Sequence, residues 1–276
     1  MTYKLLCDSC TDMTPDLLAD PHVVRVPLTI QVGPETVVDD DGFRQKELLQ
    51  KMRAWPDAPK TACPSPAAYM EQFVDDGDNY IVTLSARLSG SHNAAVQAKS
   101  LYQAEGGRGN VHVFNSRSAS AGQTQIALLI QELAGRGLGF AQVVEQVEAY
   151  ISRMHTLFVL ENLDNLRKNG RLTRVQSLVT GALRVKLLMA GTREGEIEKL
   201  GQGLSVRQTL ARMASHMAEE DHVGRRLVIA HCNCQERAEH VRELVGKRCR
   251  FGQVLIVPTN GISTVYANDG GIVVAF

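Results

Sequence analysis

The chain has 276 residues, 44% of them hydrophobic, which is enough for sizeable cores and suggests about two domains. Its 30 Lys and Arg residues balance 30 Asp and Glu residues, which argues against a global attraction to nucleic acid or membrane lipid, although a local patch can still act. No apolar run is long enough to span a membrane and the first residues lack an export signal's apolar core, so we expect a cytoplasmic protein.

The first part of the chain is expected to alternate strands and helices. An apolar run over 3–7 predicts a buried strand, followed at its carboxyl end by a polar loop containing Asp12. The stretch 23–32 is rich in β-branched residues, and Pro27 marks an edge or a break in it. The spacing of apolar residues over 43–52 predicts an amphipathic helix.

Four of the six cysteines are close in sequence to a second one. Cys7 and Cys10 form a C-x-x-C pair, and Cys232 and Cys234 follow His231. Such pairs can bind zinc or exchange electrons. Cys7 lies inside a predicted strand, however, and the second pair lacks the usual ligand spacing. The pattern therefore favours small residues at strand ends, and we expect no metal.

Two prolines stiffen the loop over 60–66. Ser65 is expected to cap a helix over 67–74. A rigid loop suits a fixed hydroxyl group such as that of Thr61, but an ordinary proline-bounded linker has the same pattern. The pattern alone favours the linker.

The chain is organised around the stretch 82–93, where a buried strand passes through a small polar loop into a helix. Unpaired N–H groups and the helix dipole make such a helix start an anion site. Ser89 and Ser91 supply hydroxyl groups, and Gly90 lets a ligand approach the backbone. A serine-rich helix cap without a ligand fits the stretch equally well.

A further polar loop, over 115–122, follows a strand predicted at 111–114 and precedes helices over 123–133 and 140–154. Several strand ends thus carry Ser, Thr and Gly, and open parallel sheets bind ligands beyond the carboxyl ends of their strands. The alternation predicts an α/β domain with a parallel sheet.

The chain changes character near a strand predicted at 156–160. Strands over 185–189 and 196–200 are expected to form a hairpin. The remaining expected elements are helices over 206–218 and 235–245 and strands over 227–230, 254–257 and 272–276. We expect an α+β domain with a mixed sheet here, which divides the chain into 1–158 and 159–276.

A basic segment lies at the start of the second part. The stretch 162–173 is predicted to form one or two helical turns that end at Asn-Gly, with Thr173 capping another helix to about residue 183. Four cations lie close together there: Arg167, Lys168, Arg171 and Arg174. A solvated charged face is the alternative to a functional role.

Four enzyme motifs are absent from the chain: the Walker loop, GxGxxG, HExxH and GxSxG. Ser89 and His92 could act as nucleophile and base of a serine hydrolase or acyl transferase, which would also need an orienting acid. The loop around Ser89 could instead bind a small anion such as phosphate.

Five short motifs in order give the chain a resemblance to the DegV family, bacterial fatty-acid-binding proteins that serve as the carrier subunit of fatty acid kinase. The segment 61–65 resembles the family's T-S-x-P-S loop, and 88–91 is similar to L-S-G-T. The segment 115–122 resembles D-S-x-S-x-x-x-G, and 166–172 resembles L-K-K-G-G-R-I. The polar loop 8–12 is similar to the family's first loop.

The resemblance implies a protein that holds one long-chain fatty acid in an apolar tunnel covered by the second domain and performs no chemistry itself. The carboxylate would be met by Thr61 and Ser89, with Gly90 allowing close approach. Tyr266 stands where the family usually carries a His. A phenol can donate a hydrogen bond to a carboxylate, but it stays neutral at physiological pH.

The resemblance also implies a kinase partner that phosphorylates the bound acid, and no cofactor. Lys168 and Arg171 are expected to help dock this partner near the mouth of the site, because complementary charge raises association rates. Transient contact with a membrane surface belongs to the same expectation, and nucleic acid does not. A hydrolase using Ser89 and His92 and a small-anion binder are the rival predictions.

Overall fold

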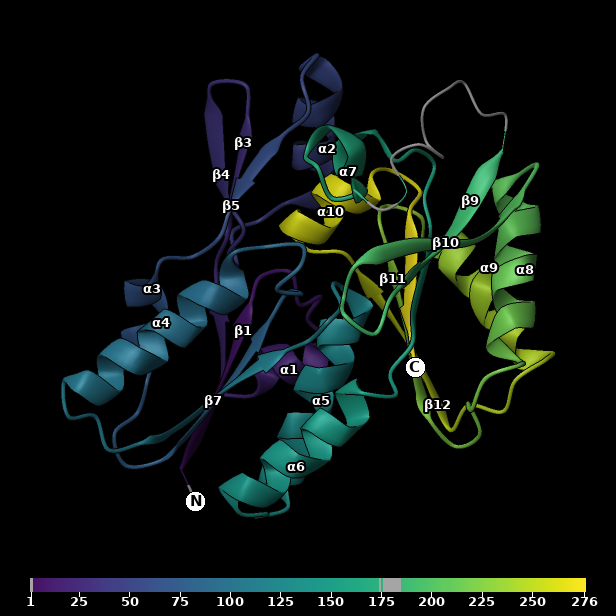
Figure 1. Cartoon of the computed structure of the whole chain (residues 1–276). Helices are drawn as coiled ribbons and strands as arrows, with labels where there is room; N and C mark the ends of the chain where they lie inside the picture. Colours follow the sequence, from purple (N-terminus) through teal and green to yellow (C-terminus); the bar gives the residue numbers. More distant parts are fainter. Residues whose placement is uncertain (1, 174, 176–184) are drawn as a thin grey trace.

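The computed structural model of the chain describes residues 2–173, 175 and 185–276 (Figure 1). Three sheets are present in this part of the chain, two large and one small. The helix predicted from Thr173 to about residue 183 lies outside the described residues but for its first position and residue 175, and Arg174 lies outside them too.

The first sheet is parallel and has the strand order β2-β1-β6-β7. Its strands are β1 (Tyr3–Asp8), β2 (Val23–Val26), β6 (Asp78–Thr83) and β7 (Asn110–Asn115). Every residue of β6 is buried, as is usual for a strand covered by helices on both faces. The predicted α/β architecture is confirmed.

Helices cover both faces of this sheet (Figure 1). The helices α3 (Pro66–Met70) and α4 (Ser91–Ala104) cover one face. The other face carries α1 (Pro15–Ala19), α5 (Ala121–Gly135) and α6 (Phe140–Ile151). Alternate strand residues serve the two faces, so Ile81 packs in the cluster of α4 while Tyr80 and Val82 pack in the cluster of α5.

The second sheet is mixed and has the order β10-β9-β8-β13-β11-β12. Only β11 and β12 pair in parallel among its neighbouring strands. Its strands are β8 (Thr156–Val159), β9 (Lys186–Gly191), β10 (Ile197–Gly203), β11 (Arg226–His231), β12 (Gln253–Pro258) and β13 (Ile272–Ala275). Its outer face carries α8 (Val206–Met217) and α9 (Gln235–Gly246), so the predicted mixed α+β region is confirmed.

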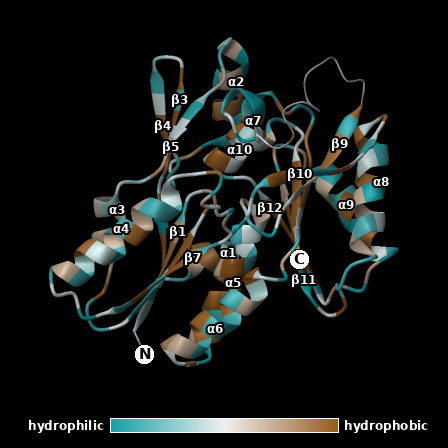
Figure 2. Ribbon diagram, viewed as in Figure 1, coloured by the Kyte–Doolittle hydropathy of each residue, from teal (hydrophilic) through white to brown (hydrophobic). Residues whose placement is uncertain are grey.

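The helix α5 lies between the two large sheets and packs against both of them (Figure 1). Figure 2 colours much of it as hydrophobic, and most of its residues are buried. Its buried amide side chain at Gln125 donates hydrogen bonds to the Ala275 oxygen at 2.8 Å and the Arg226 oxygen at 2.7 Å, both in the second sheet. One helix thus serves as core for both halves.

The predicted division at residue 158 lies inside β8, all of which pairs in the second sheet. The division into 1–158 and 159–276 stays a prediction, with β8 belonging to the second part by its pairing.

A small antiparallel sheet of order β4-β3-β5 lies beside α2 (Gln45–Ala54) and α10 (Gly261–Ala267). Its strands are β3 (Thr29–Val32), β4 (Glu35–Val38) and β5 (Lys60–Ala62). The break predicted at Pro27 is present, since β2 ends and β3 begins on either side of it. The strands β4 and β5 and the helix α10 were not predicted, and the segment 60–62 is a strand paired with β3 rather than a loop.

Candidate functional site

A cavity of about 740 Å³, measured to the surrounding atoms and including its opening, lies between the two large sheets and next to α10. Its apolar lining includes Leu84, Leu88, Phe158, Leu160, Leu166, Ile197, Ile262 and Val273. Such a lining suits an apolar ligand.

One wall of the cavity follows the strand β8. Thr156 and Phe158 of β8 and Leu160, directly after it, all line the cavity, because alternate residues of an extended segment point to the same face. Phe158 pairs with Val273 of the neighbouring strand β13, which lines the cavity beside it. The wall is therefore a continuous apolar sheet surface for most of its length.

One group of polar side chains lies where the cavity meets α10, and Arg117, Ser118 and Thr156 also line the cavity. The Tyr266 hydroxyl oxygen lies 2.8 Å from Thr61 Oγ1, so these two predicted site residues are in direct contact. The Arg171 guanidinium carbon lies 5.7 Å from the centroid of the Tyr266 ring, within reach of a cation–π interaction. Arg171 Nε also donates to the Leu88 oxygen at 3.2 Å. Tyr266, Arg171 and Leu88 all line the cavity, whereas Thr61 contacts Tyr266 without lining it.

The other two predicted carboxylate ligands lie at the start of α4. Gly90 is the residue before the helix, and Ser89 Oγ accepts the Ser91 N–H at 3.2 Å. A Cβ atom at Gly90 would lie 3.1 Å from Cys63 Sγ, directly after the strand β5 that carries Thr61. The structure therefore brings the start of α4 against the end of β5, although Ser89 and Gly90 do not line the cavity itself.

The serine hydrolase prediction finds no support in these contacts. His92 Nδ1 lies 3.2 Å from Oγ1 of Thr83, a residue of β6. Ser89 Oγ accepts a hydrogen bond from the Ser91 N–H. Within residues 2–173, 175 and 185–276, no hydrogen bond joins Ser89 to His92. Burial lowers the pKa of His92 below its usual value without placing it beside the serine.

A buried carboxylate at Asp8 fixes the loop in front of α4. It accepts hydrogen bonds from the Leu84 N–H at 2.7 Å, the Ser91 hydroxyl at 2.5 Å and the Gln123 amide at 2.7 Å. Burial raises the pKa of Asp8 above its usual value, although these donors favour the charged form. The Asp8 side chain thus connects β1 to the loop before α4, to the start of α4 and to α5.

Two further buried carboxylates hold the start of α10. Asp39 accepts the N–H groups of Gly261 at 2.7 Å and Ile262 at 2.8 Å, and burial raises its pKa to about 6. Asp12 accepts the Asn260 N–H at 2.7 Å and a Ser120 hydroxyl, and burial raises its pKa to about 7. Because α10 carries Tyr266, these two acids position the polar end of the cavity.

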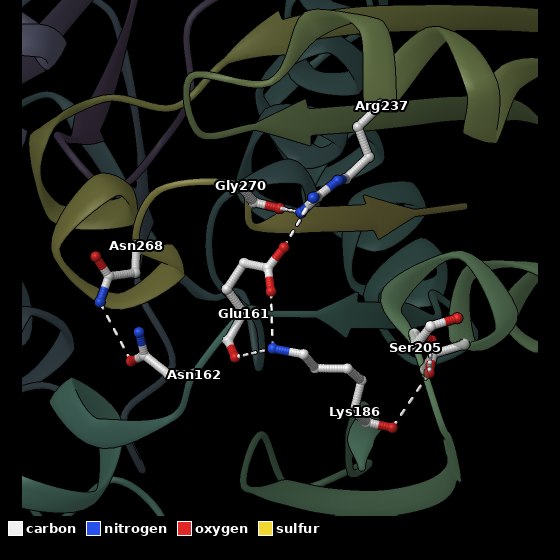
Figure 3. Close-up of polar contacts among 8 residues, drawn as sticks. Glu161, Asn162, Lys186, Ser205, Arg237, Asn268 and Gly270 are labelled. Atoms are coloured by element: carbon white, nitrogen blue, oxygen red, sulfur yellow. Dashed lines mark hydrogen bonds and ion pairs between the residues drawn. The ribbon is translucent and has the colours of Figure 1, made fainter. Parts of the chain in front are cut away.

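The other end of α10 is fixed by the polar cluster of Figure 3. Glu161 accepts hydrogen bonds from Lys186 at 2.7 Å and Arg237 at 2.8 Å, and Arg237 also donates to the Gly270 oxygen. Burial alone would raise the pKa of Glu161, but the two cations lower it below its usual value. Asn268, directly after α10, donates to Asn162 Oδ1 at 3.2 Å. The segment after Tyr266 is therefore anchored to α9 and to the residues directly after β8, and through Glu161 to Lys186 of β9.

The two predicted docking residues differ in their surroundings. Lys168 is exposed at the end of α7 (Asp164–Lys168). Arg171 is half-buried and lines the cavity beside Tyr266, with a second hydrogen bond to the Asn169 oxygen at 2.6 Å. A partner-docking role for both stays a prediction, but Arg171 faces the cavity rather than only solvent.

Three of the four paired cysteines are buried and contribute to packing. Cys7 and Cys10 are buried, Cys10 lines the cavity, and Cys232 is buried on the second sheet. In the described part of the chain, no three His, Cys, Asp or Glu side chains are grouped in a way that could hold a metal ion.

Comparison with known proteins gives consistent matches over the whole chain. The family model described as "Uncharacterised protein, DegV family" matches residues 2–276. The DegV domain-containing protein of Streptococcus gordonii is 32% identical over 278 residues, covering 100% of this chain and 99% of that protein.

Two solved structures are similar in fold and sequence. A DegV family protein from Ruminococcus gnavus, crystallised with vaccenic acid, has 48% identity and a TM-score of 0.96 and matches 100% of this chain and 99% of its own. The Streptococcus pneumoniae fatty acid kinase B3 protein loaded with linoleic acid has 32% identity and a TM-score of 0.89, with the same coverage.

Proposed function

Because the chain belongs to the DegV family, we propose that it binds a long-chain fatty acid and presents the carboxylate to a partner kinase. The observation that carries this proposal is the apolar cavity lined by Tyr266 and Arg171, with Thr61 in contact with the Tyr266 hydroxyl. Moving an acyl chain from water to an apolar cavity lowers its free energy. A buried carboxylate needs hydrogen-bond donors to offset the loss of water.

The polar end offers donors of the required kind. In this proposal the hydroxyl groups of Thr61 and Tyr266, which now bond to each other, both turn toward the carboxylate. Arg171 supplies positive charge close by, which a neutral Tyr266 cannot supply. Ser89 and the Gly90 N–H, at the start of α4, complete the set of donors.

The related structures support the same ligand class. The Ruminococcus gnavus relative holds vaccenic acid, and the Streptococcus pneumoniae relative, itself a fatty acid kinase protein, holds linoleic acid. A small-anion binder would not need the apolar walls formed by Phe158, Leu160 and Val273. A hydrolase would need a nucleophile and base in contact, and Ser89 and His92 bond elsewhere.

In the kinase complex, Lys168 would act on the surface and Arg171 on the ligand. Lys168 would meet an acidic partner, and its exposure next to the cavity-lining residues Leu166 and Arg171 supports this role. The proposal places this carrier in the cytoplasm. In the described residues, no helix is both long and apolar enough to cross a bilayer.

Lipid extraction tests the proposal directly. The protein is purified without detergent, denatured, and its extract analysed by mass spectrometry, and we expect one long-chain fatty acid per chain. Reloading with oleic acid after delipidation should restore this stoichiometry. An extract without fatty acid, together with no binding of added oleic acid, would contradict the proposal. Hydrolysis of an acyl ester that is lost in Ser89→Ala would support the enzyme instead.

A further inference from the structure

The cavity extends along the strand β8, and residues near each end of that strand identify the two ends of the cavity. Leu160 marks the end near α10, since the next residue, Glu161, is connected through Arg237 to Gly270, close behind that helix. Thr156 marks the opposite end, where its Oγ1 lies 2.7 Å from Ser118 Oγ, in the loop after β7. A strand rises about 3.3 Å per residue, so the wall from Thr156 to Leu160 is roughly 13 Å long.

Two glycines line the cavity at the Thr156 end, and they differ in what they permit. Gly195 has a positive φ of 85°, and a Cβ there would lie 2.3 Å from Ser85 Oγ. A side chain at Gly195 is therefore excluded by both its backbone and its neighbours. Gly195 is required for the hairpin tip to rest on the end of the first sheet, where Ser85 Oγ donates to its oxygen at 2.7 Å.

Gly191 is different because nothing in its surroundings requires a glycine. It ends β9, opposite Ile197 of β10, and its φ is not positive. A Cβ added there would meet the Arg117 oxygen at 3.7 Å and Thr156 Cβ at 3.8 Å, both ordinary van der Waals distances. The backbone would thus accept a side chain, and the space that it would fill belongs to the cavity.

We propose that Gly191 sets the length of the acyl chain that the cavity accepts, by leaving the end opposite Tyr266 unfilled. This inference rests on the proposed function. With the carboxylate held at Thr61 and Tyr266, the chain would run along Phe158 and Val273 and end between Gly191 and Thr156. A side chain at position 191 shortens the cavity from that end and leaves the carboxylate site untouched.

The test compares Gly191→Val with the unchanged protein over the saturated acids from decanoic to stearic acid. Valine suits a strand position because it is β-branched. Each methylene excluded from the cavity should lower the affinity about fourfold, since burial of one methylene is worth about 0.8 kcal/mol. Two or three excluded methylenes give a loss of roughly 15- to 60-fold for stearic acid. Decanoic acid should bind as before.

A matched control is available in the same hairpin. Gly201 of β10 pairs with Leu188, which belongs to the core cluster under α8, and Gly201 does not line the cavity. A Cβ there would meet Leu188 Cβ at 4.0 Å, so it is also tolerated. Gly201→Val should leave the preference for chain length unchanged.

The possible results distinguish a failure of the proposed function from a failure of the role assigned to Gly191. Should the unchanged protein bind none of the acids, the proposed function itself is wrong. Should it bind them while Gly191→Val keeps the same order of preference, or loses affinity equally for every chain length, the assignment of Gly191 is overturned. If Gly191→Val does not fold, Gly191→Ala replaces it, with an expected loss of about fourfold confined to the longest acids.

Discussion

The contact between Thr61 and Tyr266 makes Thr61→Val the sharpest test of the carboxylate site. Valine keeps the shape and β-branching of threonine in β5 and removes only the hydroxyl group, whose oxygen lies 2.8 Å from the Tyr266 hydroxyl. Without ligand, the change removes one neutral hydrogen bond between half-buried groups. The free energy of unfolding should therefore fall by only about 0.5–1.5 kcal/mol.

The effect on binding should be larger. A hydrogen bond to a charged group is worth about 1.5–3 kcal/mol, so affinity for a fatty acid should fall about ten- to a hundredfold. Affinity for the fatty alcohol of equal length should change little, because the alcohol carries no charge. Titration calorimetry with each ligand measures both values.

Two variants complete the experiment. Thr61→Ser keeps the hydroxyl group and should bind almost normally, and Thr36→Val makes the same change on β4 of the same small sheet, away from the cavity. If Thr61→Val bound acid and alcohol with unchanged affinities, the hydroxyl would not contact the carboxylate, and the site would have to be placed elsewhere.

Tyr266→Phe should weaken fatty acid binding by less than Thr61→Val, because Arg171 stays next to the ring, and a larger loss in calorimetry would contradict this ranking. Lys168→Glu should slow association with the kinase most strongly at low salt, measured by surface plasmon resonance, while Arg136→Glu on another exposed site should not. Asp12 and Asp39 have raised pKa values of about 7 and about 6, so the folded chain holds protons that the unfolded chain has released. These two acids should therefore make stability fall as pH rises from about 4 through 7, by up to about 1.4 kcal/mol per pH unit for each proton. Chemical denaturation of the unchanged chain and of Asp39→Asn at several pH values would measure the contribution of Asp39. If Asp39→Asn left the slope of stability against pH unchanged over that range, Asp39 would ionise normally in the folded protein.

The sequence predicted the elements whose pattern is local. The helix α5 was expected at 123–133 and spans Ala121–Gly135, because its apolar residues continue over several turns. The strand ends with Ser and Gly do converge on one region, and the resemblance brought in Tyr266 and Thr61, which touch. Local pattern and family motifs together were sufficient for the fold and for part of the site.

The elements that were missed depend on distant contacts. The helix α10 begins with Gly-Ile-Ser-Thr-Val, residues of low helix propensity, and it is held by the Asp39 carboxylate, 222 residues away. No local pattern distinguishes Asp39 from the two acids that follow it. The strand β5 has only three residues and exists through pairing with β3. The direction of the cavity likewise follows from sheet pairing, which a single sequence does not encode locally.

The hydrogen bonds between Asp39 and the start of α10 also determine how early during synthesis the fatty acid site can form. A ribosome adding about 5–20 residues per second needs roughly 10–45 s to travel from Asp39 to Gly261. Throughout that interval the Asp39 carboxylate lacks the N–H groups of α10 that it accepts in the folded protein, and Tyr266 has not yet been synthesised. Contacts of such long sequence separation also slow refolding of the complete chain. A nascent chain therefore lacks the Tyr266 side of the fatty acid site until α10 has emerged.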